Sequence, residues 1–231
     1  METRWHLREA DFFEGLPTEM AEFISLSARR QVRANEFIFS EGSPANSAYY
    51  LATGAVRIFR TNVWGKECVA FTRLAGEMFG LAEVVGKGAK KRECNAQALG
   101  SCQLYEIAKG DLDHFLSRHY VLANRVMDVL GRRIRYLCEQ IENLMVDDVT
   151  TRLLKLLLYL SYRQMTGVGV PSDPVTVPVR LTQEQIAAAI GSCQQTVSET
   201  LQRLERDGII EINRRQITVL KPAEIMGSLG A

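Results

Sequence analysis

The chain has 231 residues, of which 46% are hydrophobic and 24% are charged. This is an ordinary globular composition, and the length suits two small domains. The formal net charge of +1 gives no overall basic field, so any surface that binds nucleic acid must be local. No window approaches the roughly 18 consecutive apolar residues that a membrane span needs, so we expect a cytoplasmic protein with no membrane partner.

Short alternating runs separated by glycine-rich corners occupy residues 20–110. They read EFIFS, AYYLATG, AVRIFRTNV, CVAFTRL, CNAQALG and CQLYEIA. Alternation of apolar and polar residues is typical of strands, and the glycines between the runs mark tight corners. The stretch IFSEGSPANSAYYLATGAVRIFR contains two such strands that break next to Gly54. The region therefore predicts a compact antiparallel roll.

From about Leu122 to Asp148 the apolar residues follow a heptad pattern. Two sets of residues each repeat every seven positions and interleave by three and four, as the a and d positions of a coiled coil do. A stripe this narrow favours pairing with a second copy of the helix over packing on its own domain. Charge then interrupts the stripe, which places a hinge at Asp147 or Asp148. The predicted dimer seam consists of Met127, Leu130, Ile134, Leu137, Ile141 and Leu144.

A second amphipathic helix, TRLLKLLLYLSYRQ, is followed by a break, TGVGVPSDPVTVP. The break contains three prolines and two glycines, so we expect a loop or an edge strand. The next segment, TQEQIAAAIGSCQQTVSETLQRLERDGIIEINRRQITVL, is the most specific in the chain. Thr182 is placed to cap a helix, Gly191 allows a sharp turn, and Val197 fills the space between two helices. With two strands after the second helix, this order predicts a winged helix-turn-helix rather than an ordinary helical hairpin.

The second helix of this motif runs from about Gln194 to Asp207, and a basic hairpin tip follows it. Glutamine bonds adenine through two hydrogen bonds, glutamate accepts from cytosine, and hydroxyl groups bond phosphates or bases. Arginines at the tip, together with Arg180, supply local positive charge near the phosphates. The predicted DNA-binding residues are Thr182, Gln194, Gln195, Thr196, Ser198, Glu199, Arg203, Arg214 and Arg215.

A roll, a dimer helix and a winged helix-turn-helix in this order resemble the Crp/Fnr superfamily of bacterial transcription regulators, over residues 12–222. The resemblance implies an α+β chain with an effector-sensing roll at 1–119, a dimerisation helix at 120–147 and a DNA-binding domain at 148–231. It also implies a homodimer that binds a pseudo-palindromic operator in double-stranded DNA and contacts RNA polymerase. The spacing that resembles the cyclic-nucleotide-binding-like roll is that of Gly42, Asn46, Tyr50, Leu51 and Gly54.

The pocket of the cyclic-nucleotide binders is matched only in part. Those proteins carry Phe-Gly-Glu followed by Arg-Ser or Arg-Ala, in which Glu takes the ribose and Arg the phosphate. In MFGLAEVVGKGAKKREC, Leu81 stands where that Glu is expected, and Glu93 follows Arg92, where a carboxylate repels a phosphate. Leu137 and Cys138 replace the Thr-Ser pair that reaches adenine in the cyclic AMP activator. Cyclic AMP is therefore disfavoured, unless the cassette shifts so that Glu83 supplies the missing acid.

We expect an effector pocket between the roll and the central helix. Because Glu93 opposes Arg92, the effector should be a small, uncharged or cationic molecule. The predicted pocket residues are Phe79, Gly80, Leu81, Ala82, Glu83, Arg92, Glu93, Cys94, Leu137 and Cys138.

Two other kinds of signal stay open. Thiol redox sensing would use Cys68, Cys94 or Cys102, although five scattered cysteines without a CxxC pair are more typical of reduced, buried thiols. Haem or metal binding would use His6, His114 or His119, although lone histidines are more often ordinary side chains. Oxygen-sensing members of the superfamily resemble one another in a cysteine-rich N-terminus, which this chain lacks. Its CO-sensing haem members place Cys and His where this chain has Gly80 and Ala82.

The main alternative function is a cyclic-nucleotide-responsive module that acts through protein partners, and the winged helix-turn-helix argues against it. No Ser-His-Asp order, metal-ligand spacing or phosphate-binding loop supports an enzyme or a metal site. In the cyclic AMP activator the reading helix resembles Arg-Glu-Thr-Val-x-Arg, and Gln194 stands at the first of these positions. This replacement predicts a shift of preference from G toward A at one base step, in half-sites about one helical turn apart.

Overall fold

The computed structural model describes residues 11–85, 90–161 and 174–229. Its contacts divide the chain into two compact units. We call the first, Glu9–Asn62 with Ala70–Ile134, the roll unit, and the second, chiefly Arg135–Ala231, the C-terminal unit. Among the described residues, no helix is both long and apolar enough to span a bilayer.

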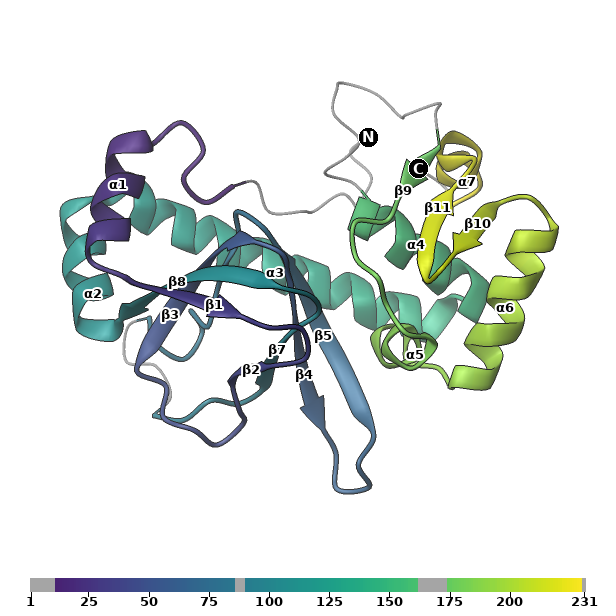
Figure 1. Ribbon diagram of the computed structural model, residues 1–231, viewed down its shortest axis with the longest axis horizontal. Helices are drawn as coiled ribbons and strands as arrows, with labels where there is room; N and C mark the ends of the chain where they lie inside the picture. Colours follow the sequence, from purple (N-terminus) through teal and green to yellow (C-terminus); the bar gives the residue numbers. More distant parts are fainter. Residues whose placement is uncertain (1–10, 86–89, 162–173, 230–231) are drawn as a thin grey trace. The chain divides into compact units, whose positions relative to one another are not determined.

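The strands of the N-terminal half form two sheets, ordered β1-β8-β3-β6 and β2-β7-β4-β5 (Figure 1). Antiparallel pairing of β3 with β8 and of β4 with β7 confirms the predicted roll. All six predicted runs form strands; β1 and β6 are further strands that the sequence did not predict. The strands are β1 (Ala28–Val32), β2 (Phe37–Phe39), β3 (Ser47–Thr53), β4 (Ala55–Thr61), β5 (Glu67–Leu74), β6 (Met78–Phe79), β7 (Asn95–Ala98) and β8 (Cys102–Ala108).

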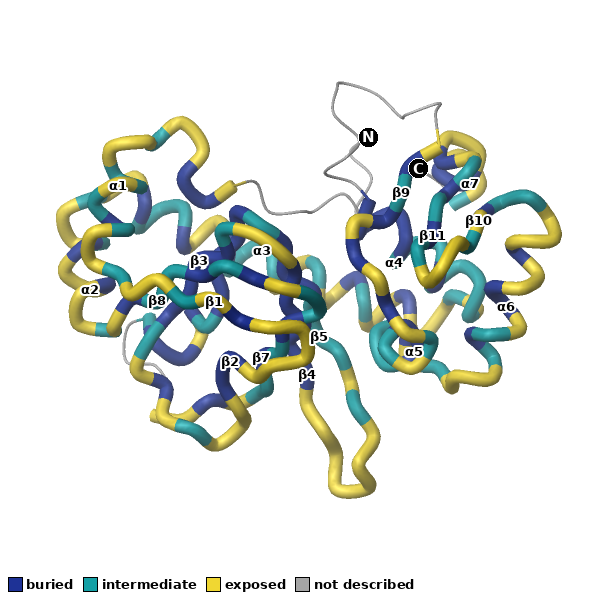
Figure 2. The backbone as a smooth tube through the Cα atoms, in the orientation of Figure 1, coloured by how far each residue is buried: buried dark blue, intermediate teal, exposed yellow. Residues whose placement is uncertain are grey.

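Strand β3 supports two hydrophobic cores because successive side chains point to opposite faces of a strand. Tyr49 and Leu51 belong to the core between the two sheets. Ala48 and Tyr50 belong to a second core, which the sheet forms with the helices. These helices are α1 (Pro17–Ser25), α2 (Lys109–Arg118) and the first half of α3 (Tyr120–Val146). Figure 2 shows buried segments in β3 and in the helices around it.

Helix α3 ends at Val146 and α4 (Val149–Ser161) begins three residues later, so the break falls at the two predicted aspartates. The Asp148 carboxylate accepts a hydrogen bond from the Thr151 amide at 2.7 Å and thereby caps α4. Lys155 of α4 reaches back to Asn143 at 2.8 Å and to Asp147 at 2.7 Å. The junction between the two helices is therefore held by side-chain bonds on both sides.

The rest of the C-terminal unit is a helix-turn-helix with a small sheet, which confirms the predicted winged fold. Its elements are β9 (Val175–Thr176), α5 (Gln183–Ile190), α6 (Gln194–Arg206), β10 (Ile210–Asn213), β11 (Gln216–Val219) and α7 (Pro222–Ser228). The sheet has the order β10-β11-β9. The predicted break after α4 contributes β9 as an edge strand, and its positions 166–173 lie outside the described residues.

Candidate DNA-binding surface and effector pocket

The turn between α5 and α6 is built as the sequence predicted. The Thr182 hydroxyl accepts from the Gln185 amide at 3.1 Å, and the Gln185 side chain accepts from the Thr182 amide at 2.9 Å. Gly191 ends α5 with a φ of 64°, a conformation that glycine adopts without strain. A Cβ there would lie 2.7 Å from a methyl group of Leu144. Val197 is fully buried between the helices, so the turn is fixed from both sides.

Helix α6 presents a polar face at its N-terminal end. Gln194, Gln195 and Glu199 are exposed, whereas Thr196 and Ser198 are half-buried. The Gln195 side-chain amide donates to the Glu199 carboxylate at 3.1 Å, which orients both groups. The face therefore offers amide donors and acceptors together with one carboxylate acceptor, the groups that read base edges in the major groove.

Two further residues share this face, although they were not predicted. Gln202 and Arg206 are exposed, and they follow Gln195 by seven and eleven residues, which places them on the same side of a helix. Their distance from Gln195 along a helix is the sequence signal that could have identified them. Arg203 lies on a different side, where its guanidinium bonds the Thr150 hydroxyl of α4.

The basic tip between β10 and β11 is a two-residue turn. Asn213 pairs with Gln216, so Arg214 and Arg215 form the loop, with φ values of 46° and 69°. Two positive φ values are what a type I′ hairpin turn requires, and Asn-Gly is the residue pair that favours it. Both arginines are exposed. The chain thus keeps two cations at positions where backbone preference selects against them.

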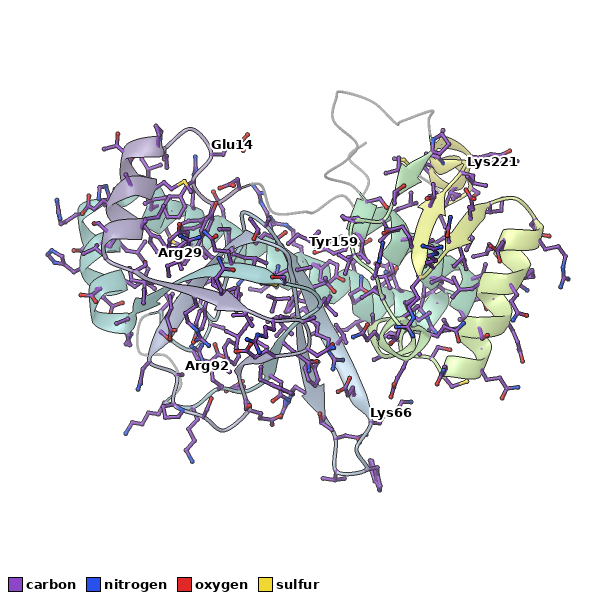
Figure 3. All side chains as sticks on the ribbon, in the orientation of Figure 1. Glu14, Arg29, Lys66, Arg92, Tyr159 and Lys221 are labelled. Atoms are coloured by element: carbon purple, nitrogen blue, oxygen red, sulfur yellow. The ribbon has the colours of Figure 1, made fainter. Side chains whose placement is uncertain are left out.

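In the roll unit, Arg92 lies among the strands of the roll (Figure 3). Its guanidinium donates to the backbone carbonyl of Gly80 at 3.1 Å, to the Glu83 carboxylate at 3.3 Å and to the Ser47 carbonyl. The guanidinium carbon lies 4.2 Å from the centre of the Phe39 ring. Gly80 has a φ of 68°, and a Cβ there would lie 2.8 Å from the guanidinium. This glycine is therefore needed for the close approach of Arg92.

The carboxylate that opposes Arg92 is Glu83, and the prediction that Glu93 does so was wrong. Glu93 is exposed, and its backbone amide lies 3.5 Å from the Glu83 carboxylate. Glu93 directly follows Arg92 in the chain, but this adjacency does not bring its carboxylate to the guanidinium. Because Glu83 is bonded to Arg92, it does not stand free to take a ribose hydroxyl.

The other predicted pocket residues separate into two groups. Phe79 stacks on Tyr49 beside the guanidinium, with ring centres 5.0 Å apart, and the Cys94 sulfur lies 4.0 Å from the Glu83 carboxylate. Leu81 instead packs in the core with the helices, and Ala82 is exposed. Leu137 and Cys138 are exposed residues of α3 within the C-terminal unit, and their place in the pocket stays a prediction.

The thiols differ in reactivity. Burial raises the pKa of Cys94 to about 11, with a further contribution from the Glu83 charge, and burial also raises the pKa of Cys102. Both are therefore protonated thiols at neutral pH and poor nucleophiles. Cys68 is exposed. Cys193, which was not predicted, is exposed at the start of α6, where a hydrogen bond with the Thr196 hydroxyl lowers its pKa.

The histidines considered for haem or metal binding are dispersed. His114 is exposed on α2, and His119 lies 2.9 Å from the Glu22 carboxylate, so it already has a partner. His6 lies outside the described residues. Within the part of the chain that the structure describes, no group of three or more His, Cys, Asp or Glu residues is arranged to hold a metal ion.

Comparison with known protein families gives two matches. Residues 29–119 match the cyclic nucleotide-binding domain, and residues 151–226 match the Crp-like helix-turn-helix domain. The first range contains the Arg92 site. The second contains α5, α6 and the basic hairpin.

Relatives match over most of the chain. The chain is 30% identical over 196 residues to the global nitrogen regulator of Synechococcus elongatus, covering 84% of this chain and 86% of that protein. It is 27% identical over 218 residues to the cyclic AMP receptor protein of Thermus thermophilus, covering 94% and 95% of the two chains.

Solved structures share the fold at lower identity. FixK2 of Bradyrhizobium japonicum matches with a TM-score of 0.74 and 20% identity, over 87% of this chain and 96% of that chain. The c-di-GMP responsive global regulator CLP of Xanthomonas campestris matches with a TM-score of 0.72 and 22% identity, over 88% and 98%. Together with the two family matches and the sequence relatives, the reading helix and its basic wing place this chain in the Crp/Fnr family of transcription regulators.

Proposed function

We propose that this regulator acts as a homodimer on a pseudo-palindromic operator in double-stranded DNA, contacts RNA polymerase there, and responds to a signal other than cyclic AMP. In this proposal residues 1–119 sense the signal, 120–147 pair the two copies and 148–231 bind DNA. The observation that carries it is the pair of surfaces in the winged helix-turn-helix: the exposed polar face of α6 and the two exposed arginines at the tip of the β10–β11 hairpin. A helix of this kind reads the major groove while basic loops contact phosphates.

The reading of bases is assigned to α6. Gln194 and Gln195 offer bidentate amides for adenine, and Glu199 accepts from cytosine. Thr182, Thr196 and Ser198 offer hydroxyl groups to the DNA backbone. Arg214 and Arg215 contact phosphates from the tip of the β10–β11 hairpin. Arg203 supports this role less directly, because its bond to Thr150 holds α6 against α4.

Dimerisation is supported by an apolar stripe left open along α3. Met127, Ile134, Ile141 and Leu144 are between 52% and 63% exposed, and Leu137 is 39% exposed. A row of exposed apolar side chains at a and d spacing is stable in water when a second helix covers it. Leu130 differs from the others, since it is half-buried against the core of the roll unit.

The proposal that cyclic AMP is not the signal is supported by Arg92 and Leu81. The arginine is already paired with Glu83, and the residue at the expected ribose-binding position is a buried leucine that packs toward the helices. The half-buried thiol of Cys94 and the buried thiol of Cys102, both protonated at neutral pH, argue against a redox signal at those two positions. The effector pocket itself remains assigned to the surroundings of Arg92.

A binding test separates this function from a module that acts only through protein partners. Purified protein should retard a DNA duplex selected from a random library, and the footprint should show two protected half-sites about one helical turn apart. Replacing Gln194, Gln195 and Glu199 together by alanine should abolish sequence-specific retention while leaving the sedimentation coefficient unchanged. A footprint of a single half-site would contradict the dimer, and no selected duplex at all would contradict the DNA-binding role.

A further inference from the structure

Arg92 is a buried cation in an apolar setting. Its side chain is 1% exposed. Its guanidinium lies over the ring of Phe39, and the ring of Tyr49 is close by, with 5.7 Å between the guanidinium carbon and the ring centre. Burial of an unpaired charge is strongly unfavourable, so this position requires an anion.

The anion that the fold supplies is Glu83, whose side chain is 8% exposed. We propose that Glu83 is a built-in ligand of Arg92: it occupies the position that the anionic group of an effector would take, and it thereby excludes anionic effectors from the roll. Glu83 is in this sense a specificity-determining residue. The inference deepens the proposed control by a signal other than cyclic AMP and rests on that proposal.

The location of the pair connects it with ligand binding. Arg92 lies within the range that matches the cyclic nucleotide-binding domain. The charged group of a cyclic nucleotide is its phosphate, and a buried arginine is the side chain best suited to bind one. An incoming phosphate would have to displace Glu83 or share Arg92 with it, and two anions at one cation repel each other.

The contacts of the Glu83 carboxylate are long, so it occupies the site beside Arg92 without making strong hydrogen bonds there. Its oxygens lie 3.3 Å from the Arg92 nitrogen, 3.5 Å from the Glu93 amide and 4.0 Å from the Cys94 sulfur. Charge-assisted bonds are typically about 2.7–2.9 Å long. The Arg92 Nε atom is also buried without a hydrogen-bond acceptor among the described residues. An external anion that enters in place of the Glu83 side chain would therefore find an unsatisfied donor.

Chemical rescue tests this arrangement directly. Glu83→Ala removes the methylene and carboxylate group beyond Cβ. An acetate ion has the same heavy atoms, so acetate is the matched probe. Breaking one partner of a buried pair should lower the Tm of the variant on the order of 10 °C. Acetate should restore most of that loss in a saturable manner, whereas chloride at the same ionic strength should not. The control variant is Glu93→Ala, which removes the same atoms from the exposed neighbour and should show neither loss nor rescue.

The same preparations are then titrated with inorganic phosphate and with cyclic AMP. Wild-type protein should show no saturable rise in Tm with either anion, and Glu83→Ala should show a rise with phosphate. If Glu83→Ala does not fold, the nearly isosteric Glu83→Gln takes its place in the phosphate titration. The proposal is overturned if acetate acts no differently from chloride on the variant, or if phosphate or cyclic AMP stabilises wild type as much as the variant.

The readout of this experiment is thermal and contains no DNA. A chain that binds no DNA and yet shows acetate rescue would refute the proposed function while leaving the role of Glu83 intact. A chain that selects an operator but shows no rescue would refute the role of Glu83 alone.

Discussion

The basic tip of the β10–β11 hairpin offers a test in which stability and function move in opposite directions. Arg214 and Arg215 have φ values of 46° and 69°, and such a conformation costs a residue other than glycine about 1–2 kcal/mol. Replacing the pair by Asn-Gly restores the residues that a type I′ turn favours. Because glycine also gives the unfolded chain more freedom, a net gain of about 1 kcal/mol is expected, or about 2–4 °C in Tm.

The same double substitution, R214N with R215G, removes two phosphate contacts from each copy. For a dimer with four such contacts, the slope of log K against log salt should flatten by about 3.6. Retardation of a fixed operator at several salt concentrations measures the slope, and thermal unfolding measures the stability. As a control, R29Q with R33Q removes two exposed charges from the roll unit and should leave the slope unchanged. An unchanged slope in the wing variant would refute the phosphate contact, and a lower Tm would refute the argument from backbone strain.

Three further predictions concern the reading helix, the seam and the thiols. Gln194→Arg should move preference at one base step from A to G, because arginine pairs with guanine; selection from a random library measures it, and an unchanged motif would remove Gln194 from the base contacts. Ile134→Glu should convert the dimer to monomers in sedimentation experiments, because it puts a charge in the apolar seam; Arg135→Glu, an exposed neighbour, should not, and dimers in both variants would rule out this seam. Iodoacetamide at neutral pH should modify Cys193 well before Cys94, because the pKa of Cys193 is lowered by its bond to Thr196 while burial raises that of Cys94 to about 11; mass spectrometry gives the order, and modification of Cys94 first would contradict the buried site.

The fold was largely predictable because its signals are local. Alternation marks strands with at least one buried face, and a heptad marks α3. Strand β1 was missed because its sequence, ARRQV, buries only Val32 and carries no alternation of apolar residues. Its position is set by pairing with β8, which joins residues about 75 positions apart in the chain, from Ala28 with Glu106 to Val32 with Cys102.

The candidate site was predictable in type but only partly in detail. The αL turn at Gly191, the cap at Thr182 and the basic hairpin tip follow from residue chemistry at fixed offsets. The partner of Arg92 does not, since adjacency in the chain suggested Glu93 and the fold brings Glu83 from nine residues away. Sequence adjacency measures distance along the backbone, whereas an ion pair depends on which way two side chains point.

The central claim is that this chain binds a specific DNA sequence without help from cyclic AMP. Selection of bound duplexes from a random library, performed with purified protein in parallel with and without cyclic AMP, tests it most directly. We predict the same pseudo-palindromic motif, enriched to the same extent, in both selections. A motif that emerges only in the presence of cyclic AMP would contradict the account of Arg92 and Glu83, and the absence of any motif would contradict the assignment of α6 as a reading helix.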